Sequence, residues 1–130
     1  MRIPGTTFSD NGPSGPPAEI EFKDFEKVDL RLGTVKAAER VPDTDKLIRM
    51  QVSFGSFERQ IVAGIGKVFD PSVIIGRQYA FVVNLAPRKF KAGGGIESHG
   101  MMLAASANDT LLLIGTTDLG PLLPDGTTIG

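Results

Sequence analysis

The 130-residue chain contains no cysteine, no tryptophan and a single histidine, His99. Without cysteine there are no thiol nucleophiles, thiolate metal sites or disulfide bonds, a composition that fits a reducing compartment. Zinc sites and most acid-base mechanisms use histidine or cysteine, so the composition argues against a metalloenzyme or a triad hydrolase. We therefore expect no catalytic residue, no metal and no cofactor in this chain.

Long hydrophobic runs are also missing. The longest, such as residues 79–83 and 111–114, are far shorter than the roughly 20 residues that cross a bilayer. The N-terminus has no hydrophobic signal core. These absences predict a protein of the cytoplasm with no membrane partner, while 41% hydrophobic residues are enough for the core of one domain.

The net charge of −1 conceals a strong gradient along the chain. Residues 31–91 hold eleven basic and five acidic side chains, whereas residues 1–30 hold three and six, and residues 92–130 hold none and four. A basic segment of this kind can supply the positive potential that nucleic-acid phosphates require. The alternative is a solvated surface with uneven charge.

Two regions differ in composition. Residues 1–20 contain four prolines and several glycines, which cannot propagate a helix or a sheet ladder, and we interpret them as a flexible tail or linker. Residues 21–130 form the predicted domain.

Periodicity within that domain predicts mostly strands. Residues 47–54 alternate apolar and polar side chains, as a half-buried strand does, and Gly55-Ser56 then turns the chain into a second strand. Gly33 allows a bulge or sharp bend. The expected elements are a short helix from Phe22 to Val28, strands at Leu30–Arg40, Leu47–Phe54 and Arg59–Ile65, a short helix opening at Asp70-Pro71, and strands at Tyr79–Leu85, Met101–Ala105 and Leu111–Ile114.

Three strands, a short helix and further strands is the order of the OB-fold, a five-stranded Greek-key barrel. We therefore expect an all-β fold: an OB-fold barrel with a short helix between strands 3 and 4 and extra C-terminal strands. A generic small barrel or sandwich is the alternative. In an OB-fold, ligands meet the face of strands 2 and 3 and two loops, which here would be residues 41–46 and 86–99.

The second of these loops carries the strongest chemical signal. Arg88, Lys89 and Lys91 lie within four positions and precede three glycines, so the backbone can approach a phosphate closely. Phe90 lies among these cations and offers a ring for stacking on a base. The alternative is a solvated, glycine-rich hairpin tip.

Five strings in order make the chain recognisable: FKDFEKVDLRLGTV (22–35), VPDTDKL (41–47), RQIVAGIGKVF (59–69), NLAPRKF (84–90) and IESHGMMLAA (96–105). From about Phe22 to Gly130 the sequence resembles the tRNA-binding domain family. That family comprises the C-terminal domain of bacterial and some archaeal methionyl-tRNA synthetases, free-standing bacterial tRNA-binding proteins, and the domain of endothelial monocyte-activating polypeptide II.

The resemblance implies a non-catalytic OB-fold module that binds tRNA by shape and backbone, usually as a homodimer in bacterial members. It also implies a synthetase catalytic domain, in cis or in trans, as a further partner. The positions matching residues linked to tRNA contact in the family, together with Lys91 of the same basic loop, are Lys46, Asn84, Arg88, Lys89, Lys91, Ser98 and Met101.

Each assignment has an alternative. Asn84 and Ser98 can hydrogen-bond sugar or phosphate oxygens, yet such residues also cap turns. Arg88 can hold a phosphate through two hydrogen bonds, while the lysines act as point charges. Met101 offers a polarisable surface to a base or ribose, but it precedes an apolar strand and suits the core equally.

Two further alternatives remain, one for the function and one for the C-terminal segment. A CsaA-like peptide-binding export chaperone has the same fold, but Asp45-Lys46-Leu47 and Ser98-His99-Gly100-Met101 favour tRNA. The apolar residues of the segment after Ala105 (Leu111 to Ile114, Leu119, Leu122 and Leu123) are either a dimer surface or a C-terminal cover for the barrel end.

Overall fold

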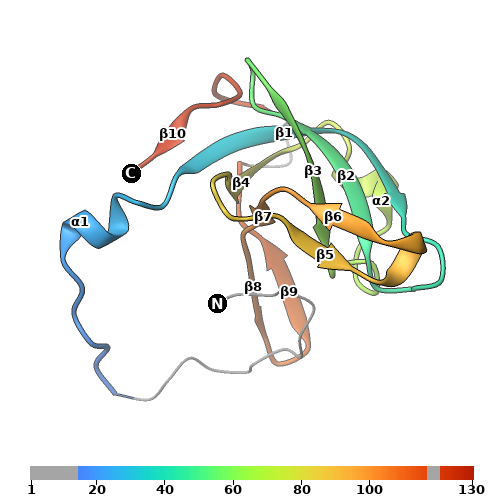
Figure 1. Ribbon diagram of the computed structural model, residues 1–130, viewed down its shortest axis with the longest axis horizontal. Coiled ribbons are helices and arrows are strands. Elements are labelled where there is room, and N and C mark those ends of the chain that lie inside the picture. Colours follow the sequence, from blue (N-terminus) through green and yellow to red (C-terminus); the bar gives the residue numbers. More distant parts are fainter. Residues whose placement is uncertain (1–14, 117–120) are drawn as a thin grey trace.

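The computed structural model describes residues 15–116 and 121–130, so most of the predicted tail at residues 1–20, and Leu119, lie outside the described residues. The described elements are mostly strands (Figure 1). The helices are α1 (Phe22–Phe25), α2 (Pro71–Ile74) and the 3-10 turn η1 (Ala92–Gly94). The strands are β1 (Leu30–Arg40), β2 (Ile48–Ser53), β3 (Glu58–Ala63), β4 (Gln78–Val82), β5 (Arg88–Phe90), β6 (Ile96–Ser98), β7 (Met101–Met102), β8 (Ala104–Ala107), β9 (Thr110–Leu113) and β10 (Thr128–Ile129).

Five of these strands make the barrel. They are ordered β3-β2-β1-β4-β7, every neighbouring pair is antiparallel, and β10 pairs with the start of β1. The segment before β7 then returns to β3, where the His99 backbone N–H donates to the Gln60 carbonyl at 2.8 Å and nearly closes the sheet. The expected OB-fold order, with α2 between β3 and β4, is therefore confirmed.

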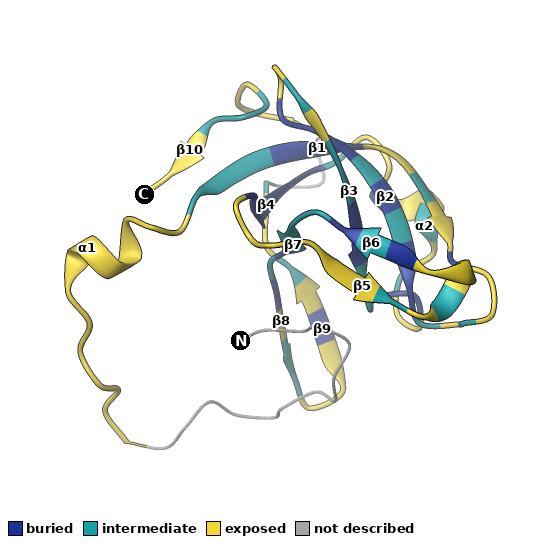
Figure 2. Cartoon of the chain, viewed as in Figure 1, coloured by how far each residue is buried: buried dark blue, intermediate teal, exposed yellow. Residues whose placement is uncertain are grey.

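The alternating sequence of β2 explains why the barrel has an inside and an outside. Ile48, Met50 and Val52 are at most 1% exposed and fill the interior with Phe54 and Phe81, whose rings meet edge to face at 5.5 Å. Figure 2 shows buried residues along β2, β3 and β4, with exposed residues along β5 and the outer connections. Burial of this apolar face is the main force that holds the strands in register.

The predicted bend at Gly33 takes a different form. The pairing of β1 with β2 shifts between Val35 and Ala37, so the bulge lies after Gly33 rather than at it. Gly33 instead serves close packing, because an added Cβ would lie 2.6 Å from the Phe54 ring. The glycine makes room for an aromatic core side chain.

Helix α2 begins as its sequence predicts. The carboxylate of Asp70 caps the helix by accepting hydrogen bonds from the hydroxyl and the backbone N–H of Ser72, and these bonds lower the pKa of Asp70. Pro71 occupies the first turn, and Gly76 follows the helix with a φ of 84° that favours glycine.

Three expectations for the C-terminal half need correction. The expected loop at residues 86–99 contains a second hairpin, β5–β6, and the expected strand Met101–Ala105 is divided into β7 and β8. The division has a physical reason: β7 stays on β4, whereas β8 leaves the barrel to pair with β9. The last strand, β10, was not expected from the sequence.

The chain after β9 covers part of the barrel. The buried side chain of Gln78 donates to the Leu123 carbonyl at 2.7 Å, and the Gly126 N–H donates to the Leu32 carbonyl at 2.7 Å. Residues 121–130 are thus tied to β1 and β4, in agreement with the covering alternative. Leu112, Ile114, Leu122 and Leu123 nevertheless stay between 44% and 62% exposed.

Candidate nucleic-acid interface

The hairpin β5–β6 presents the predicted cations to solvent. Arg88, Lys89 and Lys91 are all exposed, and the first two lie on β5, opposite Ser98 and Glu97 of β6. The Lys89 ammonium lies 3.8 Å from Glu97, but its side chain is 81% exposed, so this pair adds little stability and leaves the cation accessible. The hairpin therefore displays a compact positive surface.

The underside of the hairpin anchors it to the barrel. Ile96 and the partly buried Phe90 and Ala92 form a small second core with Val41, Leu47 and Val62. At the tip, a Cβ on Gly93 would lie 2.7 Å from Val41, so the two predicted ligand loops are in direct contact. The cations are held by packing on an ordered hairpin.

Phe90 contacts both the second core and one of the predicted cations. Its ring packs into the second core, and the Arg88 guanidinium carbon lies 4.8 Å from the ring centroid. The ring is half-buried, so part of it stays accessible beside Arg88. A guanidinium over a ring keeps its donor N–H edge available to an anion.

Ser98 is buried, at 3% exposure. Its hydroxyl oxygen accepts the Val62 backbone N–H at 2.9 Å and donates to the Gly100 carbonyl at 2.9 Å. Both contacts join the β6–β7 segment to β3, where the barrel closes. The side chain thus satisfies two backbone groups of the barrel wall.

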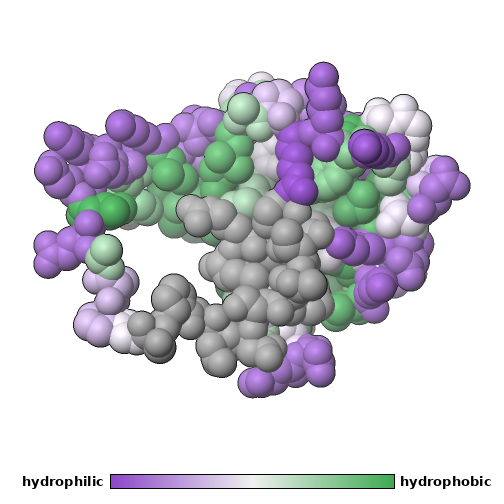
Figure 3. All heavy atoms as spheres, turned by 60° about the horizontal axis from the view of Figure 1, so that its bottom comes forward, coloured by the Kyte–Doolittle hydropathy of each residue, from purple (hydrophilic) through white to green (hydrophobic). Residues whose placement is uncertain are grey.

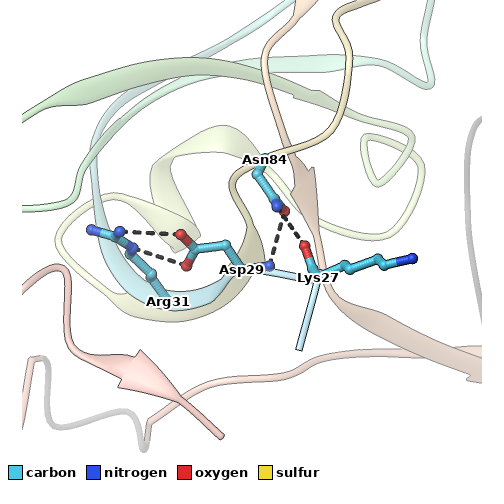
Figure 4. Close-up of polar contacts among 4 residues, drawn as sticks. All are labelled: Lys27, Asp29, Arg31 and Asn84. Carbon is cyan, nitrogen blue, oxygen red and sulfur yellow. Dashed lines mark hydrogen bonds and ion pairs between the residues drawn. The ribbon is translucent and has the colours of Figure 1, made fainter. Parts of the chain in front are cut away.

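Asn84 follows β4 and is used in a similar way (Figure 4). Its Oδ1 accepts the Asp29 backbone N–H at 2.9 Å, and its Nδ2 donates to the Lys27 carbonyl at 2.6 Å. Both ends of the amide therefore hold the chain between α1 and β1. This arrangement matches the alternative in which Asn84 is a structural cap.

Lys46 and Met101 are both half-buried. Each belongs to a segment next to the hairpin β5–β6. Lys46 is in the connection between β1 and β2, where its carbonyl accepts the Gly66 N–H at 2.7 Å. Met101 begins β7 and pairs with Val82 of β4. The connection of Lys46 contacts the hairpin tip through Val41, and Met101 lies just beyond its C-terminal end.

Two hollows accompany this surface. One, of about 540 Å³, is lined by the hairpin residues Lys89, Phe90, Lys91, Gly95, Ile96 and Glu97. The other, of about 240 Å³, lies on the outer face of β1, β2 and β3 and includes the Arg49–Glu39 ion pair. Both are open and shallow, which suits an extended polymer better than an enclosed small molecule.

Sequence reasoning overlooked one pair of cations. Arg31 of β1 and Arg59 of β3 both lie over the Phe57 ring, with guanidinium carbons 5.4 and 5.1 Å from its centroid. Phe57 and Arg59 are neighbours in the sequence, but no local pattern indicates that Arg31, on β1, joins them.

In residues 15–116 and 121–130, no three histidine, aspartate or glutamate side chains are grouped as metal ligands. Within the same residues, no helix is long and apolar enough to span a membrane.

Comparison with known proteins identifies relatives of this surface and its barrel. Residues 30–122 match the model of the tRNA binding domain family. A methionine-tRNA ligase from Bacteroides fragilis is 45% identical over 97 residues, and one from Thermotoga maritima is 46% identical over 95. These matches cover 75% and 73% of this chain but only 14% and 15% of the ligases.

Solved structures agree with the fold. A MetRS-related protein from Pyrococcus horikoshii is similar with a TM-score of 0.78 and 36% identity, covering 88% of this chain and 100% of that protein. The chaperone CsaA from Bacillus anthracis follows with a TM-score of 0.73 and 33% identity, covering 87% and 100%. The likeness thus extends over nearly the whole described barrel.

Proposed function

Because the chain belongs to the tRNA-binding domain family, we propose that it is a non-catalytic module that binds tRNA through its hairpin β5–β6. The observation that carries this proposal is the ordered set of three exposed cations, Arg88, Lys89 and Lys91, on a hairpin that packs against the first ligand loop. Three cations held on an ordered hairpin match the spaced phosphates of a folded RNA.

Phosphate contacts supply the binding energy in this mechanism. Arg88 is oriented by Phe90 and presents the planar donor edge that suits a phosphate, whereas Lys89 and Lys91 contribute as point charges. Lys46 and the partly exposed Met101 extend the surface on either side of the hairpin. Few base edges are read, so the module recognises the shape of tRNA.

Ser98 and Asn84 contribute indirectly under this proposal. The burial and hydrogen bonds of Ser98 hold β6 on β3, and the amide of Asn84 holds the chain that precedes β1. Replacing either residue should therefore loosen the scaffold and leave the RNA contacts of the folded module in place. The direct contacts are the cations and Met101.

The module acts by raising the local tRNA concentration for a partner. We place it as the C-terminal domain of a methionyl-tRNA synthetase, or as a free-standing homologue that works with one, in the cytoplasm where tRNA is charged. Residues 1–20, rich in proline and glycine, suit a linker to such a catalytic domain. Tethering then improves tRNA capture through effective concentration.

A homodimer is part of the same proposal. Exposed apolar side chains lie on α1 and its flanks and on the chain after β8; they are Ile20, Phe22, Phe25, Val28, Leu112, Ile114, Leu122 and Leu123. Figure 3 shows hydrophobic atoms beside the hydrophilic end of the molecule where α1 lies. A second copy would cover this surface and place two cationic hairpins on one assembly. Light scattering at micromolar concentration tests this, and a monomer there excludes the dimer.

The second candidate function is peptide binding, which the similarity to CsaA favours. An apolar surface exposed on α1 would then receive an extended peptide rather than a second copy. Titration with an unfolded, tRNA-free polypeptide such as reduced carboxymethylated lactalbumin distinguishes the two. Saturable binding that tRNA does not compete supports this candidate.

The main proposal is tested by titrating bulk tRNA at 50 and 200 mM salt, with an unstructured RNA of equal length as competitor. We expect saturable, salt-sensitive binding that tRNA competes best. The double variant Arg88→Gln/Lys89→Gln should lower the salt slope by about 1.4 to 1.8, because each phosphate contact contributes roughly 0.7 to 0.9.

Lys23→Gln is the matched control, since Lys23 is an exposed cation on α1, 3.3 Å from Glu21 and outside the hairpin. It removes one charge and should leave the slope within error. Equal losses in the control and in each hairpin single variant would show that only net charge matters, and absence of binding at 50 mM would refute the proposal.

A further inference from the structure

Phe57 lies in the turn between β2 and β3, and its ring contacts two cationic side chains from separate strands. The guanidinium carbons of Arg31 and Arg59 lie 5.4 and 5.1 Å from its ring centroid. The other neighbour of the ring is Phe54, stacked at 5.3 Å and itself 1% exposed. Two positive side chains therefore share one aromatic platform at the end of the barrel core.

The charges of this cluster are not balanced within the described residues. Asp29 accepts two hydrogen bonds from Arg31, at 3.0 Å from Nε and 3.1 Å from Nη2, and these bonds raise the pKa of the Arg31 guanidinium. Arg59 has no ion pair with any residue in the part of the chain that the structure describes. Its neighbour Glu58 instead accepts a hydrogen bond from Gln51. Only one of the two guanidinium groups is thus paired with a carboxylate, and the cluster keeps a net positive charge.

The contact with the Phe57 ring favours binding of an anion by Arg59. A guanidinium laid over an aromatic ring loses hydration on one face but keeps its donor N–H edge available. Because the ring limits its rotamers, less side-chain entropy is lost when the edge binds a ligand. The charge of Arg31 near the same ring adds to the attraction that Arg59 exerts on an anion. The chemistry that fits is a phosphate, which takes paired N–H donors.

Strand β3 connects the cluster to the hairpin through its two faces: Phe57 and Ile61 belong to the main core, whereas Val62 packs under the hairpin with Ile96. Arg59 precedes Gln60, whose carbonyl accepts the His99 N–H at 2.8 Å at the end of β6. Strand β3 lies alongside both β6 and β7, and Met101 begins β7. A chain of phosphates that leaves Arg88 and follows β3 toward its first residues therefore reaches the partly exposed Arg59 at the barrel end.

We propose that Arg59 and Arg31, held over Phe57, form a second phosphate-binding site that takes the RNA backbone as it passes from the hairpin β5–β6 to the barrel end. This inference rests on the proposed function, because its ligand is a phosphate of the same RNA. It adds a contact that lies outside both predicted ligand loops. Arg59 makes the direct contact, and Asp29 keeps Arg31 in position beside it.

The experiment compares three variants at this site and on the hairpin. Arg59→Gln should weaken tRNA binding about 3- to 10-fold at 100 mM salt and reduce the salt slope by roughly 0.7 to 0.9, the value for one phosphate. Arg59→Lys keeps the charge but loses the planar edge, so it should recover the slope and only part of the affinity. Arg88→Gln gives the loss for one hairpin contact, and Lys23→Gln is the control for net charge.

Thermal unfolding separates binding from stability, because Arg59 also covers part of the Phe57 ring. Binding is measured well below the unfolding midpoint of every variant. If Arg59→Gln binds tRNA like the unmodified chain while Arg88→Gln is impaired, the second site is refuted and the hairpin mechanism stands. If Arg59→Lys restores neither slope nor affinity, the role of Arg59 is structural and the inference is wrong. If the unmodified chain does not bind tRNA, the proposed function itself fails.

Discussion

Ser98→Ala separates structural from ligand-contact roles at the point where the barrel closes. The substitution removes one hydroxyl from a side chain that is 3% exposed and leaves the backbone unchanged. Val62, also buried at 6% exposure, loses the acceptor of its backbone N–H, and Gly100 loses the donor to its carbonyl. No solvent reaches the Val62 N–H in this position, so its lost hydrogen bond is not replaced by water.

The expected loss of stability follows from these two contacts. An unpaired buried N–H costs about 1 to 3 kcal/mol, and loss of the second hydrogen bond costs about 0.5 to 1.5 kcal/mol. The sum of roughly 1.5 to 4.5 kcal/mol corresponds to a fall in melting temperature of about 6 to 18 °C for a domain of this size. Circular dichroism during thermal unfolding measures this difference directly.

Binding of tRNA by the same variant, measured at 10 °C where it remains folded, should change less than twofold. Ser56→Ala is the control, because Ser56 is exposed in the β2–β3 turn and its replacement should change stability by less than about 0.5 kcal/mol. An unchanged melting temperature together with a tenfold loss of tRNA affinity would refute the assignment of Ser98 to barrel closure and restore it as a ligand contact.

Three further predictions concern the scaffold. Gly33→Ala should destabilise the domain by about 1 to 3 kcal/mol in denaturant titrations, because its Cβ would lie 2.6 Å from the buried Phe54 ring; unchanged stability would mean that the core repacks freely. Asn84→Ala should speed amide hydrogen exchange in the segment before β1, since both of its hydrogen bonds end there; unchanged protection would show that other contacts hold the segment. Asp70 should titrate below the ordinary aspartate pKa in NMR, because Ser72 hydrogen-bonds its ionised form. A lowered folded-state pKa stabilises the protein above the unfolded-state value, and this contribution is lost as pH falls through the folded-state pKa. Asp70→Asn should therefore be less stable at neutral pH, and the difference should vanish in acid.

Local sequence determined the first half of the barrel with little ambiguity. The alternation of β2, the turn at Gly55 and the proline at the start of α2 are short-range signals, and each of these elements lies where its pattern predicts. The sequence predicted the charges of the hairpin β5–β6 but not its two strands, because the tip between them is rich in glycine. Those glycines lower strand propensity, while packing of Ile96 against Val62 restores the pairing.

By itself, then, the sequence determined the strand order, the family and the cations of the hairpin, because periodicity, motif order and charge are all properties of neighbouring residues. Tertiary structure alone decided which partners the polar side chains have. Ser98 and Asn84 were predicted to contact tRNA, and their hydrogen bonds to Val62, Lys27 and Asp29 span 36 to 57 residues. Phe57 likewise gathers Arg31 and Arg59 only after β1 and β3 take their places in one barrel. A hydroxyl, an amide or a guanidinium group has the same chemistry in the sequence whether it is buried or exposed, and only the folded chain fixes its partners.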